Sequence, residues 1–288
     1  MAEITGALAA AAEAKRMHKQ RMMAFEEHRH PNGVVYMTSP VLRAKHGFST
    51  RYGGVSTGEL SSLNLGSNRG DVPERVFRNF DLLGEATGID VRHMAFTRQV
   101  HGNVVRTVTE ADVHKFGTPV PYEADGLVTD RPGLALICFS ADCVPVLLCD
   151  DAHGVIGAVH CGWRSSVGDI LNNAVEQMRA LGAATGQICA AIGPAIGACC
   201  FEVGREVIDA AEAWLGDGLD GLYVPEAGKD GKFLLDLKGA NARRLRQLGL
   251  SAENIAVSGE CTMCAHDKYW SSRYTKDRRG SQGALIVL

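Results

Sequence analysis

The sequence predicts an α/β (α+β) fold, with mixed β-sheets flanked by helices in a single domain. Short apolar runs rich in β-branched residues, each bounded by turn or polar residues, are typical of buried strands. Segments with apolar residues at helical spacing lie between these runs, with no long linker and no internal repeat. A chain of 288 residues is long enough to enclose a sizeable core.

The first 34 residues are expected to form an N-terminal helical extension outside the domain, which spans residues 35–288. Residues 3–30 are rich in Ala, Glu, Lys, Arg and Met, which favour a helix, and Pro31-Asn32-Gly33 ends it. The simplest interpretation is a surface or oligomer-contact helix. His28 and His30 at its end are expected to be solvated rather than metal-binding.

Local patterns then predict the elements of the domain in order. The helix at 73–88 begins at a proline, carries apolar residues at helical spacing and stops at Gly88. Further helices are expected at 165–181, 205–215 and 237–248, each with an apolar side. Strands are expected at 34–42, 134–139, 144–149, 155–159, 188–192, 233–237, 255–257 and 284–288.

The strands at 144–149 and 155–159 are separated by a short polar turn, so they are expected to form a β-hairpin. Asp142 and Cys143 precede the first of these strands, whereas His160 and Arg164 follow the second. Because a hairpin brings its two open ends side by side, Cys143 and His160 are expected to face one cavity.

Three other loops carry polar residues that suit a site. Arg51 lies in the glycine-rich loop at 46–58, which predicts an anion cradle, although such a loop can also be plain surface. Gln99 and His101 lie where a strand meets a turn, a position where histidine is often structural. Asp125 belongs to a turn that precedes a strand.

His101, Cys143 and His160 together supply the three ligands that a catalytic zinc ion needs, with one position left open. Their gaps of 42 and 17 residues fit no short metal motif. Cys143 with His160 or His101, oriented by Asp142, would equally form a nucleophilic Cys–His pair. The sequence does not separate a thiolate that attacks from one that holds a metal.

Cys261-x-x-Cys264 with His266 suggests half of a structural zinc site or a redox pair. No second Cys-x-x-Cys completes it, so packed cysteines near a loop are the simpler account. Cys199 and Cys200 are likewise expected to be packed small hydrophobes.

Composition excludes several classes of function. The net charge of −3 provides no polycationic surface for nucleic acid. No apolar run approaches the roughly 18–20 residues that a membrane helix needs. The N-terminus lacks the pattern of a signal peptide, and nine cysteines, an odd number, favour free thiols in a reducing cytoplasm.

The ordered motifs resemble the YfiH-like laccase-domain family, described as purine nucleoside phosphorylases and earlier as multicopper polyphenol oxidases. The resemblance covers about residues 35–288. It does not extend to the segment at 271–277, which departs from the family pattern and leaves Arg273 outside the predicted site. The matching stretches begin at His46, Asn64, Gln99, Ala124, Ser140, Ala158, Ile192 and Gly283.

The resemblance implies one zinc ion per chain, held by His101, Cys143 and His160, within the mixed-sheet fold. It also implies phosphorolysis of adenosine, inosine, guanosine or S-methyl-5′-thioadenosine, with deamination of adenosine as a second reaction. For this chemistry we expect Arg51 and Arg164 to hold phosphate and Gln99 to line the substrate site. Asp142 would either move a proton or fix the loop of Cys143.

Three alternatives stay open from the sequence. The same family carries the label peptidoglycan editing factor, which implies an amidase acting on a cell-wall precursor. A copper-dependent polyphenol oxidase is disfavoured because a multicopper site needs many histidines, usually in His-x-His pairs. The chain has 10 histidines and one His-x-His, which lies outside the region of resemblance, although one Cys–His–His site could hold a single copper. A non-enzymatic partner protein with a vestigial site is disfavoured by the complete ligand set.

Overall fold

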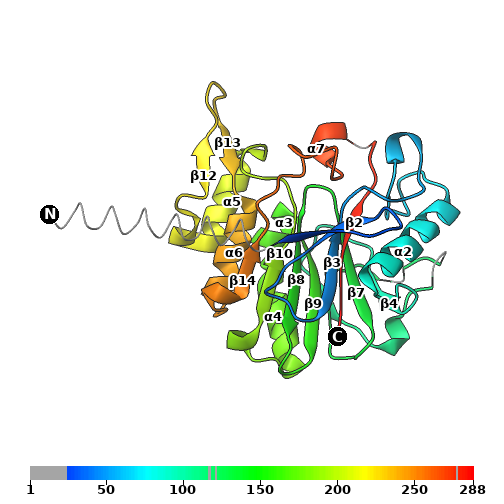
Figure 1. Cartoon of the computed structure of the whole chain (residues 1–288). Helices are drawn as coiled ribbons and strands as arrows, with labels where there is room; N and C mark the ends of the chain where they lie inside the picture. The colour runs from blue at the N-terminus through cyan, green and yellow to red at the C-terminus, as the bar shows by residue number, and fades with distance from the viewer. Residues whose placement is uncertain (1–24, 116–117, 121, 277) are drawn as a thin grey trace.

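The computed structural model describes residues 25–115, 118–120, 122–276 and 278–288. Two six-stranded sheets pack face to face, and helices cover their outer sides (Figure 1). No helix in these ranges is long and apolar enough to cross a membrane.

The first sheet has the strand order β1-β2-β3-β15-β7-β4. Its last strand in the sequence, β15, lies in the middle, paired antiparallel with β3 on one side and β7 on the other. The strands are β1 (Glu26–Arg29), β2 (Val35–Thr38), β3 (Lys45–Ser49), β4 (Met94–Ala95), β7 (Ala135–Ser140) and β15 (Gln282–Val287).

The second sheet has the order β14-β10-β8-β9-β6-β5, and a third, three-stranded sheet has the order β11-β13-β12. The second sheet comprises β5 (Val105–Thr107), β6 (Gly126–Thr129), β8 (Val144–Asp150), β9 (Val155–Cys161), β10 (Cys189–Ile192) and β14 (Ile255–Val257). The third comprises β11 (Glu202–Gly204), β12 (Tyr223–Pro225) and β13 (Lys232–Leu235).

Alternating side chains of β8 divide the interior into two cores. Val144, Val146 and Leu148 face the helices, whereas Leu147 and Cys149 face the other sheet. This period of two explains why β8 reads as a continuous apolar run, since both of its faces are buried. The neighbouring hairpin strand β9 is buried throughout for the same reason.

The helices fill the outer layers. α2 (Pro73–Thr87) packs on the first sheet, and α4 (Ile170–Ala180) with α6 (Leu237–Gln247) packs on the second. α5 (Arg205–Leu215) packs on the third sheet, and α3 (Trp163–Val167) and α7 (Ser272–Thr275) are short. The 3₁₀ turns are η1 (Gly58–Leu60), η2 (Glu110–Asp112), η3 (Thr185–Gln187), η4 (Gly216–Leu219) and η5 (Ala252–Asn254).

Most predicted elements are confirmed, with boundaries that shift by a few residues. The hairpin is confirmed, because β8 and β9 pair antiparallel from Val144↔Cys161 to Asp150↔Val155. The helix predicted at 205–215 and the strand predicted at 255–257 have the predicted bounds. The mixed sheets flanked by helices agree with the predicted fold class.

Two predicted helices need correction. Within the proposed N-terminal extension, residues 26–29 form strand β1, which pairs with β2; residues 1–24 lie outside the described ranges. The helix predicted at 165–181 is broken into α3 and α4 at Gly168 and Asp169. Asp169 adopts a left-handed conformation with φ 63°, and its carboxylate accepts hydrogen bonds from Arg244 and Trp214.

Candidate metal centre

The three predicted metal ligands meet beside one end of β8 and β9, two central strands of the second sheet. Cys143 immediately precedes β8, and His160 lies near the end of β9, where it pairs with Pro145 of β8. His101 comes from the turn that follows Gln99. Antiparallel pairing of β6 with β9 brings Asp125, the residue before β6, alongside His160.

The spacing of the ligand atoms suits a single metal ion. One ligand atom from each of His101, Cys143 and His160 lies within 4.8 Å of the others. The Cys143 Sγ is 3.7 Å from the His101 Nε2, and the two imidazole rings lie edge to face with centroids 4.9 Å apart. Since zinc ligands lie about 2.0–2.3 Å from the ion, ligand atoms of a tetrahedral site are about 3.5 Å apart.

Asp125 fixes two of these ligands from behind. Its Oδ1 is 2.8 Å from the Nδ1 of His160, which leaves the Nε2 of that ring to face the site. The same carboxylate accepts backbone N–H bonds from Val100, His101 and Gly102, so it also shapes the turn that carries His101. A carboxylate behind a ligating histidine sets its tautomer and orientation in many metal sites.

One side of the ligand set is open to solvent. His160 is only 3% exposed, whereas His101 is exposed and Cys143 is half-buried. Gly162 makes room for the ring of His101, because a Cβ there would lie 2.8 Å from its Cδ2. His101 and Asp142 both have positive φ, at 61° and 84°. Such strained backbone in non-glycine residues concentrates at functional sites.

The electrostatics of the site favour the ligand form of the cysteine. Burial opposes ionisation of Cys143, but His160 and His101 beside it lower the pKa of the thiol to about 6. Burial also disfavours a charge on His160, yet Cys143 and Asp125 raise the pKa of its imidazole to about 9. The metal-free site therefore holds a thiolate beside an imidazolium near neutral pH, and metal binding displaces the imidazole proton.

In metal-free protein, alkylation of Cys143 by iodoacetamide is expected to accelerate as the pH rises through about 6, because the thiolate is the reactive form. Quantitative peptide mass spectrometry at a series of pH values measures it. Buried Cys138, whose pKa burial raises to about 12, should stay unmodified as an internal control. A midpoint near the ordinary thiol value of about 8.5 would contradict this electrostatic picture.

Asp142 holds the loop of Cys143 in place. Its Oδ1 accepts a hydrogen bond of 2.6 Å from the Thr262 hydroxyl, and its Oδ2 accepts one of 2.6 Å from the Arg273 N–H. Its own carbonyl accepts from the N–H of Ile196. Of the two roles predicted for Asp142, these contacts favour fixing the ligand loop over moving a proton.

The glycine-rich loop uses Arg51 structurally. Its Nε and Nη2 donate to the Ser61 carbonyl at 3.0 and 2.6 Å, and its Nη1 donates to the His266 carbonyl at 2.9 Å. The guanidinium also lies over the Trp270 ring, 4.0 Å from its centroid. These contacts tie the arginine to the loop backbone and weaken its prediction as a phosphate ligand.

Gln99 and Arg164 differ in their contacts: the Gln99 side chain is hydrogen-bonded to the backbone, whereas the guanidinium of Arg164 is exposed. The amide of Gln99 donates to and accepts from the backbone of Phe139, at 2.8 and 2.7 Å, so it fixes the end of β7. Arg164 is exposed on α3, with its guanidinium 4.2 Å from the centroid of the Trp163 ring. Within the described ranges Arg164 has no hydrogen-bond or ion-pair partner, which leaves its donors available.

Sequence reasoning missed the roles of Asp125 and Thr262. Asp125 was assigned only to a turn, although Ala124-Asp125-Gly126 is one of the motifs that carried the family resemblance. The signal for the role of Asp125 was its place in that motif, directly before strand β6, which pairs with β9. Thr262 offered none, because it is joined to Asp142 across 120 residues of sequence.

The chain is similar to known proteins over most of its length. The family model described as multi-copper polyphenol oxidoreductase laccase matches residues 45–288. A purine nucleoside phosphorylase of Deinococcus radiodurans is 40% identical over 256 residues, which cover 89% of this chain and 94% of the relative. A protein of an unknown prokaryotic organism named adenosine deaminase RL5 is 35% identical over 234 residues, covering 78% and 87%.

Solved structures are similar over nearly the same length. The crystal structure of the Bacillus licheniformis hypothetical protein YfiH superposes with a TM-score of 0.84 at 30% identity, covering 91% of this chain and 98% of that one. The structure of YlmD from Geobacillus stearothermophilus gives a TM-score of 0.81 at 31% identity with the same coverage.

Proposed function

Because the chain belongs to the multi-copper polyphenol oxidoreductase laccase family, we propose that it is a zinc-dependent purine nucleoside phosphorylase that also deaminates adenosine. The substrates would be inosine, adenosine, guanosine or S-methyl-5′-thioadenosine together with inorganic phosphate. The products of phosphorolysis would be the free base and the pentose 1-phosphate.

The observation that carries the proposal is the convergence of His101, Cys143 and His160, with Asp125 behind them. Two imidazoles and one thiolate form a three-ligand set of the kind that catalytic zinc uses, with the exposed side left for substrate. When bound, the ion would act as a Lewis acid and lower the pKa of a water ligand, which serves deamination.

The described part of the chain has too few grouped ligands for a multicopper oxidase site. These ranges contain two groups of three or more potential metal ligands, and one of them consists of cysteines alone. Other histidines are dispersed: His28 bonds to Thr38, His93 to Glu110 and His153 to Asp150. A single copper ion at the His–Cys–His group is chemically possible, but a cluster of several coppers is not supported.

Phosphorolysis requires an anion held against the ribose C1′ while the purine leaves with the bonding electrons. We assign the binding of this anion to Arg164. Its side chain is exposed and has unused donors, and the residue lies three positions after the end of β9. A guanidinium can bind two phosphate oxygens at once. Asp125 and Asp142 keep the ligand side chains in position for this step.

Release of hypoxanthine from inosine, measured with and without phosphate, tests the proposal. We expect release only with phosphate, together with ribose 1-phosphate in equal amount, and loss of release after chelation with recovery on adding zinc. Equal release without phosphate would indicate hydrolysis instead. No release from any of the four nucleosides by zinc-loaded protein would contradict the proposal and favour the amidase, whose reaction needs no phosphate.

Arg164→Gln is expected to raise the KM for phosphate by about 10- to 100-fold, because a hydrogen bond to a charged group is worth about 1.5–3 kcal/mol. The KM for inosine should change much less. Steady-state kinetics with phosphate as the varied substrate measure both constants. Arg179→Gln, at an exposed position of α4, is the matched control and should behave as wild type. An unchanged phosphate KM in Arg164→Gln would show that the anion binds elsewhere.

A further inference from the structure

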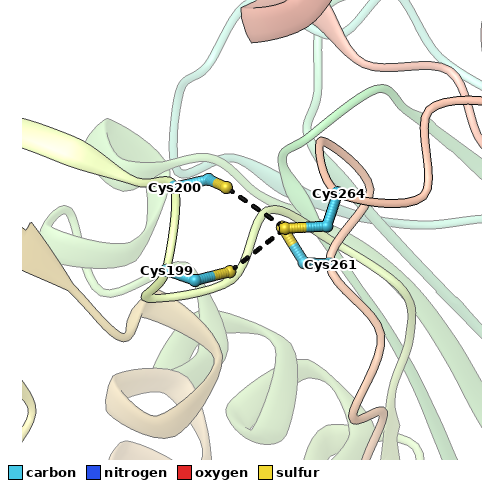
Figure 2. A group of neighbouring side chains, drawn as sticks. All are labelled: Cys199, Cys200, Cys261 and Cys264. Carbon is cyan, nitrogen blue, oxygen red and sulfur yellow. Dashed lines mark hydrogen bonds between the residues drawn. The ribbon is translucent and has the colours of Figure 1, made fainter.

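Four cysteines outside the His–Cys–His centre converge at the molecular surface. The sulfur atoms of Cys199, Cys200, Cys261 and Cys264 all lie within 4.8 Å of one another. Cys264 Sγ is 3.5 Å from the Sγ of Cys199 and 3.4 Å from that of Cys200, and the side chains from two separate loops point toward one another (Figure 2). The prediction of simply packed cysteines is wrong for Cys199 and Cys264, which are exposed, whereas Cys200 and Cys261 are half-buried.

The distances suit four thiolates around one ion. With a Zn–S distance of about 2.3 Å, the sulfurs of a tetrahedral site are about 3.8 Å apart. The separations of 3.4 and 3.5 Å are close to this value and far longer than the roughly 2.05 Å of a disulfide bond. A multi-iron cluster fits less well, because its cysteines bind different iron atoms and must spread around a larger core.

The local backbone is shaped to receive a thiolate. The N–H of Gly197 donates to Cys261 Sγ at 3.1 Å, and the N–H of Cys264 bonds to the same sulfur. Ala265 N–H bonds back to the Cys261 carbonyl, which closes the Cys-x-x-Cys segment into a tight turn. Amide donors around ligand sulfurs are the outer contacts that orient thiolates on a metal.

We propose that Cys199, Cys200, Cys261 and Cys264 form a tetrathiolate zinc site with a structural role, separate from the His101–Cys143–His160 centre. All-thiolate sets select soft or borderline ions such as zinc. The missing half of the Cys-x-x-Cys pattern is therefore supplied by two adjacent cysteines rather than by a second Cys-x-x-Cys.

The proposed site would join two loops that position the first centre. Cys261 pairs with Ala195 through a β-bridge, and Thr262 N–H donates to the carbonyl of Ala195. Thr262 lies between Cys261 and Cys264 in the sequence. Its hydroxyl donates a hydrogen bond to Asp142, the residue before Cys143. A metal ion at the four cysteines would thus fix the residue that anchors the loop of Cys143.

Metal content under reducing conditions tests this proposal. After zinc loading and removal of free metal, elemental analysis should give about two zinc ions per wild-type chain, one from each site. His101→Ala and the double variant Cys261→Ser, Cys264→Ser should each lose one of them. Cys189→Ser, at a half-buried cysteine outside both clusters, is the matched control and should keep both.

X-ray absorption of zinc-loaded His101→Ala decides the ligand identity even if the double cysteine variant fails to fold. We expect a first shell of sulfur alone at about 2.3 Å. Zinc-free His101→Ala protein, or a shell that contains nitrogen, would overturn the proposal. The proposal would also be overturned if the wild-type chain held one zinc ion and the double cysteine variant held the same one. Disulfides among these cysteines in freshly reduced protein, detected by intact mass, would also overturn it.

Discussion

His101→Ala is expected to abolish phosphate-dependent release of hypoxanthine from inosine. The substitution removes one of three ligands, and the loss should exceed about 100-fold, since even partners behind the ligands are worth about 10–100-fold. Folding should persist because the His101 side chain is exposed and its hydrogen-bond partner among the described residues is the Cys143 thiol of the site itself. Initial rates at saturating phosphate and inosine measure the effect, with the melting temperature as a check on folding.

The matched control for this experiment is His93→Ala, which removes a half-buried histidine that bonds to Glu110 and lies outside the His–Cys–His group. That variant should retain wild-type rates. If His101→Ala kept most of its activity, the His–Cys–His group would not be the catalytic centre, and the site of purine release would have to be sought elsewhere on the chain.

Asp125→Ala is expected to weaken both the metal centre and the fold. Removal of the carboxylate leaves the buried ring N–H of His160 and three partly buried backbone N–H groups without their acceptor. We expect zinc affinity to fall by about 10–100-fold. The free energy of unfolding of the metal-free protein should fall by about 3–5 kcal/mol, the cost of breaking a buried charged pair.

Zinc competition against a chelator and denaturant titration measure these two quantities. Burial opposes ionisation of Asp125, but the contacts with His160 and with the N–H groups of Val100 and Gly102 outweigh it and lower the pKa of the carboxyl. This contribution to stability is therefore present above the ordinary carboxyl range and is lost as the pH falls through the lowered value. Asp125→Asn, which keeps the shape but not the charge, should lose less stability. Wild-type zinc affinity in both variants would contradict the orienting role.

The part of the site that depends on neighbouring strands could be predicted from the sequence. A turn of a few residues between two apolar runs sets the pairing of β8 with β9, and that pairing alone places Cys143 beside His160. His101 is different, because it is 42 residues from Cys143 and no local spacing connects them. Its residue type made it a candidate third ligand, and the family resemblance then strengthened that assignment.

Contacts between segments that are distant in the sequence could not be predicted from local sequence patterns. The role of Asp125 depends on the pairing of β6 with β9, and the four-cysteine cluster depends on two loops that lie 64 or 65 residues apart. The strand β1 was hidden because its charged residues favour a helix locally, whereas pairing with β2 decides its conformation. In each case tertiary contacts outweigh local preference.

The central position of β15 has a consequence for how the protein is made. Strands β3 and β7 each pair with β15, so the first sheet stays in two parts until residues 282–287 have left the ribosome. During synthesis the unpaired edges of β3 and β7, together with the apolar residues that later form the inter-sheet core, are exposed to other chains. Nascent chains stalled before Gln282 should therefore depend on chaperones and aggregate readily, even though the hairpin that carries the metal ligands Cys143 and His160 has already been synthesised.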